Sequence, residues 1–415
     1  MSRKIYVAIV VNPDETKYFN NGLHQNAFYL HKLLQQIDLV VPLLVAPPAM
    51  FRNSSAIDTS DGVPDQVNAF GQVVYNWDLF KKDYHLDALL LISAAVEPEE
   101  LAKFRENNVK IVSIIYGNRY VTDQETMIFG ALKRPKGEGI RPAANDLLRE
   151  DQQADVVWVS PHYAWQRDYI QHRYGADRSY VCPYVWDPEL LELKYDSNAF
   201  WEGRSPYYDY SLPSAKSVFV TEPNVSVTKT TLFPLIVLEK LHNQNPDLMT
   251  KAYCYGAEDA ALHNEPFKKY ASGLNIVKAG GVTFPGRHPY PLITARSQVL
   301  FHHQFANALN YTMLEAAHLD LPVVHNSEFM KDFGYYYRGG SVTEATQQLE
   351  RALRHGERED LEDYVRNSEK MLNQFSLFNQ SNIEGYVSLL ANALDAKIEP
   401  KLPEYIVELE KKLEA

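Results

Sequence analysis

Short apolar runs alternate with segments of helical spacing along most of the chain, which is the pattern of an α/β protein. In the first half the expected strands are residues 4–11, 39–45, 88–92, 110–115 and 155–159. They are nearly continuous in apolar residues, as strands buried on both faces of a parallel sheet are. The helices expected between them are residues 26–36 and 98–107. This alternation predicts a doubly wound sheet.

A second series of the same kind begins near residue 216. Its expected strands are residues 217–221, 250–255, 274–278, 299–303 and 322–325, and its expected helices are residues 230–242, 258–272 and 308–318. We therefore expect an N-terminal Rossmann-like domain at 1–190, a connection at 191–215, a C-terminal Rossmann-like domain at 216–375 and helices at 376–415. Two such domains facing one cleft would bind ligands at the carboxyl ends of their strands.

Composition narrows the class of protein. The 415 residues are 45% hydrophobic and 23% charged, which is typical of a soluble globular protein. No apolar run approaches the roughly 20 residues that a membrane span needs. Two cysteines give neither a disulfide framework nor a metal cluster, so a cytoplasmic location is expected. The net charge of −12 disfavours a general nucleic-acid coat but leaves a local basic surface open.

The most informative stretch is residues 304–326, where a strand leads through a polar loop into a helix. Backbone N–H groups at such a loop and helix start can bind phosphate. Asn307, Asn310 and Tyr311 line the turn, and Glu315 on the helix could accept hydrogen bonds from a ribose diol. Two plainer roles stay open: Asn310 as a helix cap and Glu315 as an ordinary ion-pair partner.

A second candidate loop follows the strand that ends at Thr221. Lys229 lies where this loop enters a helix, a position that is unfavourable for a cation unless it meets an anion such as a diphosphate. Asn224 and Thr228 in the same loop could bind phosphate or cap the helix. The pattern favours a diphosphate site around Lys229.

The N-terminal domain offers candidates for catalysis. Gly22, in the loop after the first strand, is expected to bind the donor because glycine allows close approach of the backbone to a ligand, and His24 in the same loop could be catalytic or merely exposed. Asp123 or Glu125, after the strand at 110–115, could act as general base or orient an acceptor hydroxyl. The residues do not decide between the two carboxylates, and a structural role for both remains open.

A basic segment rich in glycine and proline begins at residue 133 and is expected to lie beside the cleft. The residues expected to contact the acceptor are Asn118, Arg119, Lys133, Arg134, Lys136 and Arg141. Such a segment could hold a phosphate backbone, although runs of this kind are often solvated surface.

Three motifs carry a resemblance to known proteins: TEPNVSVTKT at 221–230, NALNYTMLEAAHLDLPVVHNS at 307–327 and VWVSPHY at 157–163. The C-terminal half resembles the donor-binding domain of GT-B glycosyltransferases. In that superfamily a lysine follows a basic residue by five positions, and two glutamates are eight positions apart. Lys229 and Glu315 match the lysine and the second glutamate, whereas Asn224 and Asn307 stand where the other two are usual.

More closely, the motifs are similar to a family of bacterial and phage GT-B-like proteins, and the similarity covers most of the chain. Some phage enzymes of this type are implicated in placing sugars, including arabinose, on hydroxymethylcytosine in their own DNA. Bacterial relatives resemble surface-glycan enzymes. The resemblance implies a nucleotide-sugar donor, and it implies that Glu315 holds the ribose while Asn307 contacts the sugar.

The resulting hypothesis is a GT-B glycosyltransferase that uses a UDP-sugar, such as UDP-arabinose or UDP-glucose. The absence of an Asp-x-Asp motif favours a mechanism without metal, and no cofactor is expected beyond the donor. The favoured acceptor is 5-hydroxymethylcytosine in double-stranded DNA, in the host cytoplasm if the protein is phage-encoded. Two alternatives remain: a surface-polysaccharide glycosyltransferase and an inactive nucleotide-binding module.

Overall fold

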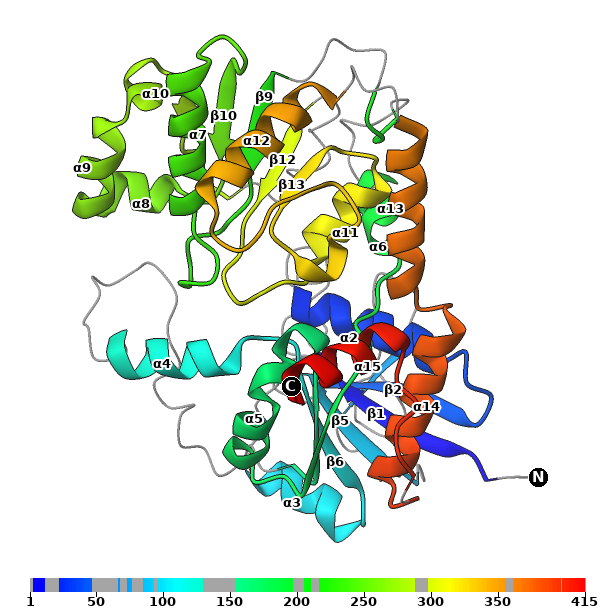
Figure 1. Cartoon of the computed structure of the whole chain (residues 1–415). Coiled ribbons are helices and arrows are strands. Elements are labelled where there is room, and N and C mark those ends of the chain that lie inside the picture. The colour runs from blue at the N-terminus through cyan, green and yellow to red at the C-terminus, as the bar shows by residue number, and fades with distance from the viewer. Residues whose placement is uncertain are drawn as a thin grey trace. The chain divides into compact units, whose positions relative to one another are not determined.

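The computed structural model divides the chain into two α/β units (Figure 1). It describes residues 3–11, 22–46, 66–67, 73–76, 85–92, 96, 98–129, 154–196, 205–209, 216–287, 298–355, 361–396 and 398–414. Unit 1 comprises Met1–Lys133, Arg141–Leu190 and Phe375–Ala415, and unit 2 comprises Arg134–Ile140 and Leu191–Gln374. Among the described residues, no helix has both the length and the apolar character to cross a bilayer.

Unit 1 is built on an eight-stranded sheet with the order β3-β4-β2-β1-β5-β6-β7-β8. Its strands are β1 (Ile5–Val10), β2 (Val40–Ala46), β3 (Gln66–Val67), β4 (Val73–Asn76), β5 (Ala88–Ile92), β6 (Lys110–Ile115), β7 (Val156–Val159) and β8 (Arg178–Val181). Neighbouring strands are parallel except β3 and β4. The five strands expected in the first half all lie in this sheet.

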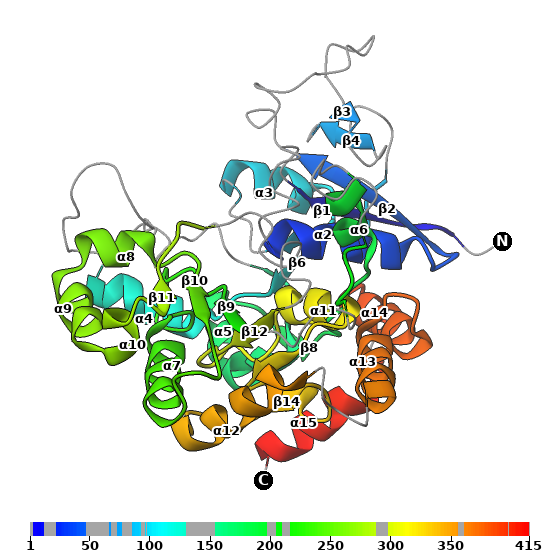
Figure 2. The same cartoon turned by 90° about the horizontal axis from the view of Figure 1, so that it is seen from above.

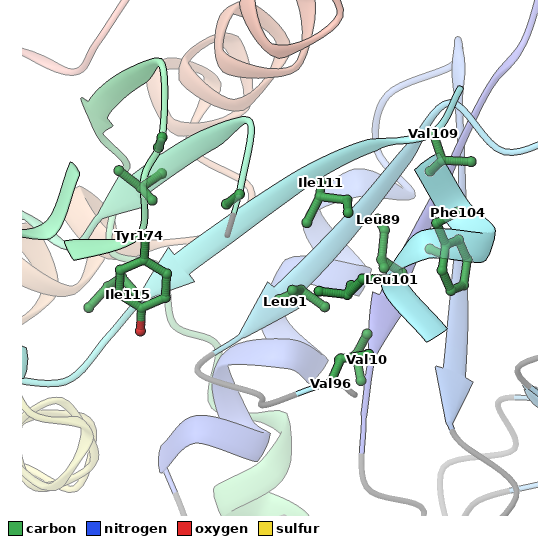
Figure 3. Close-up of a cluster of buried hydrophobic side chains, with 14 of the residues drawn as sticks. Val10, Leu89, Leu91, Val96, Leu101, Phe104, Val109, Ile111, Ile115 and Tyr174 are labelled. Atoms are coloured by element: carbon green, nitrogen blue, oxygen red, sulfur yellow. The ribbon is translucent and has the colours of Figure 1, made fainter. Parts of the chain in front are cut away.

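Helices cover this sheet and bury its apolar side chains. They are α2 (Gly22–Leu34), α3 (Pro98–Glu106), α4 (Arg119–Phe129), η5 (Pro161–Gln166), α5 (Arg167–Arg173), α14 (Gln380–Ala393) and α15 (Glu404–Glu414), with α6 (Glu189–Asp196) and α13 (Leu361–Phe375) at the boundaries with unit 2. Figure 3 shows part of the core, in which Leu101 and Phe104 of α3 pack with Leu89 and Leu91 of β5 and with Ile111 of β6.

The C-terminal helices belong to unit 1, although they follow unit 2 in the sequence. The helix α14 packs against α2 (Figure 1), and α15 packs against η5. Ile406 of α15 is fully buried in a cluster with Ala164 and Val181. Residues Phe375–Ala415 therefore complete the unit that Met1–Lys133 and Arg141–Leu190 begin.

Unit 2 has a six-stranded parallel sheet with the order β11-β10-β9-β12-β13-β14. Its strands are β9 (Ser217–Val220), β10 (Lys251–Cys254), β11 (Val282–Thr283), β12 (Val299–His302), β13 (Val323–His325) and β14 (Tyr335–Tyr336). Its remaining helices are α7 (Leu232–Gln244), α8 (Glu258–His263), α9 (Glu265–Gly273), α10 (Asn275–Lys278), η7 (Glu328–Met330), α11 (Tyr311–His318) and α12 (Val342–Leu353). Figure 2 shows α7 and α12 packed side by side.

Two sequence-based expectations for unit 2 were wrong in detail. Residues 274–278, expected as a strand, contain the helix α10, and the strand β11 begins only at Val282. The helix expected at 258–272 is two helices, because Asn264 breaks it and its side chain caps α9 by accepting a hydrogen bond from Phe267 N. The expected fold class, with two parallel-sheet α/β domains and C-terminal helices, is confirmed.

Candidate functional site

The sheet of unit 2 has its topological switch point between β9 and β12. From β9 the chain proceeds to β10 and β11 on one side, and from β12 it proceeds to β13 and β14 on the other. Ligands of open α/β sheets bind beyond the carboxyl ends of the strands at such a point. The two loops that leave it, at 221–231 and 303–310, are the two that the sequence identified as candidates.

Asn224 organises the loop after β9. Its backbone is left-handed, with φ of +54°. Its side-chain nitrogen donates to the carbonyls of Glu222 (2.9 Å) and Gly256 (3.2 Å), and its oxygen accepts from Thr231 N (2.8 Å) and Thr231 Oγ1 (2.9 Å). These four bonds use the full capacity of the amide. Asn224 thus ties β9, the loop after β10 and the start of α7 together, and its predicted contact with a donor stays a prediction.

Lys229 lies in the same loop, three residues before the first residue of α7. Its backbone N–H donates to Ser226 O (3.0 Å) and its carbonyl accepts from Asn224 N (3.0 Å), so the loop closes as a small hairpin. Burial lowers the pKa of the Lys229 ammonium; the Glu222 carboxylate acts against this shift, and Arg287 adds to it. A partly desolvated ammonium next to a second cation is a position that a bound anion would stabilise.

Thr228 is buried, and its backbone carbonyl accepts a hydrogen bond of 3.0 Å from Phe305 N in the loop after β12. Its hydroxyl shares a bond of 3.0 Å with Ser226. The two candidate loops are therefore joined directly, and the residue that the sequence proposed as a phosphate ligand also holds them together.

A chain of four buried polar side chains crosses the switch point. Glu222, two residues beyond β9, is 0% exposed, and its Oε1 lies 3.0 Å from His302 Nδ1 at the end of β12. Gln304 Nε2 donates to Glu222 Oε2 over 3.0 Å, and Asn307 Nδ2 donates in turn to Gln304 Oε1. Of these four, the sequence identified only Asn307. The signal that could have found the others is a polar residue at or within two residues of the carboxyl end of each of two strands that become neighbours.

His303 lies beside this chain and is held among aromatic rings. Its ring stacks on Phe233 of α7 with centroids 3.8 Å apart, and its Nδ1 shares a hydrogen bond of 2.7 Å with Tyr337 Oη. Burial lowers the pKa of His303 to about 4, and nearby His302 contributes. His303 is therefore neutral at physiological pH and supplies shape and hydrogen bonding rather than charge.

The loop after β12 enters α11 through Asn310. Its side-chain oxygen accepts a hydrogen bond of 2.8 Å from Thr312 N, so Asn310 is the N-cap of α11. Tyr311, the first residue of α11, is buried. Ser327 Oγ donates to Ala308 O over 2.5 Å, which fixes the loop to the segment after β13. The capping role that the sequence left open for Asn310 is the one seen here.

Glu315 is buried on α11. Tyr195 of α6 lies close to it: burial raises the pKa of the Tyr195 hydroxyl, and the negative charge of Glu315 adds to this shift. Tyr195 was not identified from the sequence, because α6 lies 120 residues earlier, within the expected connection. A buried carboxylate with a neighbouring phenol is a suitable pair for binding hydroxyl groups.

In unit 1 the candidate Asp123 is part of a polar cluster around α4. It accepts a hydrogen bond of 2.6 Å from Tyr169 Oη and pairs with Arg119 Nε (2.9 Å) and Arg173 Nε (3.4 Å). Asn118 caps the start of the same helix. These contacts support the structural alternative for Asp123 and show structural contacts for Arg119 and Asn118, and the proposed catalytic and acceptor roles stay predictions.

The other N-terminal candidates are less informative. Gly22 is the first residue of α2 and is exposed, while His24 in the same turn and Glu125 on α4 are half-buried. Four of the expected acceptor residues lie outside the described residues: Lys133, Arg134, Lys136 and Arg141. Within the described part of the chain, no three His, Cys, Asp or Glu side chains are grouped so that they could hold a metal ion.

Comparisons with known proteins identify the family of this chain and solved structures that are similar to it. A family model described as "Protein of unknown function (DUF2827)" matches residues 5–390. No curated protein sequence matches significantly. Similar solved structures include a trehalose-6-phosphate synthase from Burkholderia multivorans, with 12% identity, 96% of this chain and 100% of that chain covered and a TM-score of 0.56.

Two further structures cover comparable lengths. The trehalose-6-phosphate synthase OtsA has 13% identity, 96% and 100% coverage and a TM-score of 0.57. The pneumococcal O-GlcNAc transferase GtfA, in complex with UDP and GlcNAc, has 8% identity, 95% and 100% coverage and a TM-score of 0.51. At these identities the likeness establishes the fold, which is that of GT-B glycosyltransferases.

Proposed function

The chain belongs to the DUF2827 family, and from the geometry of unit 2 we propose that it is a glycosyltransferase that takes its sugar from a nucleoside-diphosphate sugar. The observation that carries the proposal is the pair of loops at the switch point of unit 2. One loop holds the desolvated Lys229, and the other leads into α11 with the buried Glu315. A diphosphate and a ribose are the groups that such a pair would bind.

The leaving diphosphate develops negative charge as the glycosidic bond breaks. Lys229, Arg287 and the backbone N–H groups at the start of α7 would stabilise that charge. We expect them to act in place of a metal ion, because the sequence has no Asp-x-Asp motif. The lowered pKa of Lys229 supports this role, since an ammonium that has lost water gains most from an anionic ligand.

The donor is proposed to be a UDP-sugar. Two structures of the same fold support uridine: GtfA was solved with UDP, and an E. coli trehalose-6-phosphate protein was solved with UDP-2-fluoro glucose. Glu315 would accept hydrogen bonds from the ribose hydroxyls, and Asn307 would contact the sugar. UDP-glucose and UDP-arabinose are the donors to test first.

The acceptor proposed from the sequence is the hydroxymethyl group of 5-hydroxymethylcytosine in DNA, with a surface polysaccharide as the alternative. The basic segment that begins at Lys133 supports DNA, because cationic side chains would contact its phosphates. An inactive nucleotide-binding module is the alternative of another class, and the Asn residues at 224 and 307 are what support it.

Calorimetry with UDP, UDP-glucose and UDP-arabinose tests the donor half. The wild-type protein should bind UDP, and Lys229→Met and Glu315→Gln should each weaken binding by about tenfold or more. Lys278→Met, at an exposed lysine of α10, is the matched control and should bind as the wild type does. Unchanged UDP affinity in both site variants would refute this donor site.

Incubation with bound donor and DNA tests the acceptor. Hydroxymethylated and unmodified duplexes should be compared by mass spectrometry, with free UDP measured in parallel. A mass gain of one sugar on the hydroxymethylated duplex alone supports the DNA acceptor. UDP release without a mass gain on DNA points to another acceptor, and bound donor without any UDP release points to the inactive module.

A further inference from the structure

Glu222, Gln304 and Asn307 form a hydrogen-bonded chain with a fixed direction, here called the amide relay. Glu222 lies beyond β9, and the other two lie in the loop after β12. All three are buried, with exposures of 0%, 5% and 4%. The relay therefore joins the two strands of the switch point out of contact with bulk water.

The direction of the relay follows from the chemistry of its first member. An ionised carboxylate only accepts hydrogen bonds, so Gln304 must turn its nitrogen toward Glu222, as it does over 3.0 Å. Gln304 Oε1 then faces the other way and accepts from Asn307 Nδ2. Because the Asn307 nitrogen is directed at Gln304, its carbonyl oxygen is turned away from Gln304. The charge on Glu222 thus orients an amide that it does not touch.

The backbone at the middle of the relay is held in place. Asn326, beyond β13, accepts from Gln304 N over 3.2 Å and donates to Gln304 O over 2.9 Å. This two-point contact holds the backbone of Gln304, so rotation of the side-chain amide is the freedom that remains. A change of charge at Glu222 or at position 307 should therefore turn the Gln304 amide and alter the hydrogen bond at the opposite end of the relay.

Stability alone does not explain a buried carboxylate here. Removing a carboxylate from water is costly, and a well-packed apolar side chain is often as stabilising as a buried charge with its partners. Buried charges and polar chains can instead impose one arrangement on their surroundings. The arrangement in question is that of Asn307, which lies in the loop proposed to bind the donor.

We propose that Glu222 is a positioning residue for the donor sugar: through Gln304 it orients Asn307 so that the Asn307 carbonyl oxygen accepts a hydrogen bond from a sugar hydroxyl. This inference rests on the proposed function, since it needs a sugar at that site. It assigns roles to Glu222 and Gln304, neither of which contacts the sugar.

Moving the charge from one end of the relay to the other tests the inference. In Asn307→Asp two carboxylates compete for the single NH₂ of Gln304, and in Glu222→Gln the group that sets the direction is lost. The double variant carries one carboxylate again, at position 307. There Gln304 can donate to the new carboxylate and accept from the new amide, which reverses the direction of the relay but satisfies every member.

The ratio of the affinities for UDP-sugar and UDP is the first readout, because it isolates the sugar contact from the diphosphate and ribose contacts. Each single variant should lower this ratio about tenfold. The double variant should return the ratio to within about threefold of the wild-type value, because the carboxylate at position 307 still accepts a hydrogen bond from the sugar hydroxyl. A double variant no better than the worse single variant would overturn the relay.

Urea unfolding of the same four proteins is the second readout and needs no ligand. Each single change should lower the folded-to-unfolded ratio about tenfold, and the double variant should recover most of it. Asn310→Asp is the matched control: this cap keeps its acceptor oxygen, so its effect should add to that of Glu222→Gln without recovery. If the double variant at 222 and 307 loses as much unfolding free energy as the two single variants together, the relay is refuted.

The two readouts separate the inference from the proposed function. A wild-type protein that binds no UDP-sugar, with recovery in urea, would refute the donor site and with it the positioning role, while retaining the relay as a structural device. Sugar binding that is unchanged in all three variants would refute the positioning role alone. If one single variant does not fold, recovery of folding in the double variant still decides whether the ends are coupled.

Discussion

At the scale of single residues, Lys229 determines how binding should depend on pH. Burial lowers the pKa of its ammonium below the ordinary 10.5, and only the charged form attracts a diphosphate. UDP affinity should therefore be highest at neutral pH and should fall as the pH rises through this lowered pKa, earlier than for an exposed lysine. Calorimetry between about pH 6 and pH 10 measures the decline.

The Lys229→Met variant tests whether Lys229 causes this decline in UDP affinity. It removes the charge while keeping an unbranched side chain, and it should lower UDP affinity at neutral pH by about 10- to 100-fold. It should also remove the part of the alkaline decline that is due to Lys229. A decline that is equally steep in the variant would mean that another group titrates.

Glu315 should confer selectivity for ribose. If its carboxylate accepts hydrogen bonds from the ribose hydroxyls, the wild type should bind UDP about tenfold or more tightly than 2′-deoxy-UDP. In Glu315→Gln this preference should shrink, because a neutral amide is a weaker acceptor. Competition calorimetry of the two nucleotides measures it, and Glu328→Gln, at an exposed carboxylate beyond β13, is a control that should keep the preference. Equal binding of both nucleotides by the wild type would contradict the ribose role.

The sequence located these residues but not their partners. Lys229 and Glu315 stand out because a polar loop follows an apolar strand, and this signal is local. The bond from Gln304 to Glu222 joins residues 82 positions apart, so it exists only because β9 and β12 become neighbours. Asn224 is similar: one of its four bonds reaches Gly256, 32 positions away, and the motif spacing could not show it.

At the scale of elements, Gly256 connects the loops after β9 and β10. Its φ of +78° is left-handed, and an added Cβ would lie 3.0 Å from Pro223 Cα and 3.2 Å from Glu222 O. Both neighbours are backbone, so neither can move without moving the loop that carries Lys229. Gly256→Ala should cost about 1–3 kcal/mol of unfolding free energy and should also weaken UDP binding.

Gly273→Ala is the control for this prediction. Gly273 ends α9, has no atom within 4 Å of the added Cβ and lacks a left-handed backbone, so its substitution should be neutral or slightly stabilising. Urea unfolding and UDP titration of both variants provide the measurement. A Gly256→Ala variant as stable as the wild type would show that the two loops are not tightly coupled.

The strands were more predictable than the short elements. β5 and β6 coincide with their expected ranges because they are buried along their length and the apolar run is continuous. β8 was not expected, because three of its four residues are only half-buried and its composition is mixed. α10 was mistaken for a strand because a four-residue segment with two adjacent apolar residues, Ile276 and Val277, has no periodicity that distinguishes one turn of helix from a strand.

At the scale of the whole molecule, the chain enters unit 2 and then returns. Residues from Phe375 onward belong to unit 1, where Tyr386 Oη donates to Pro183 O over 2.8 Å and lies 3.0 Å from Tyr116 Oη. Unit 1 therefore needs residues from beyond unit 2 in the sequence, whereas all the proposed donor-binding residues of unit 2 lie within one uninterrupted segment. This division implies that the stability of unit 1 and the donor affinity of unit 2 can be changed separately.

Ile406→Ala tests this separation. Ile406 is fully buried on α15 against Ala164 and Val181, all in unit 1, so truncation should cost about 2–5 kcal/mol of unfolding free energy. UDP affinity at 25 °C should stay within about twofold of the wild type, since a folded donor site binds without help from α15. Val387→Ala, at an exposed position of α14, is the control and should change stability by less than about 0.5 kcal/mol.

Calorimetric unfolding with and without UDP makes the test sharper. UDP at about 100 times its dissociation constant should stabilise the unit that binds it by about 2.7 kcal/mol. In Ile406→Ala we therefore expect two unfolding transitions. UDP should raise the midpoint temperature of the unit 2 transition, and the substitution should lower that of the unit 1 transition. A single transition moved by both would show that the units unfold together, and a large loss of UDP affinity in Ile406→Ala would show that the donor site depends on unit 1.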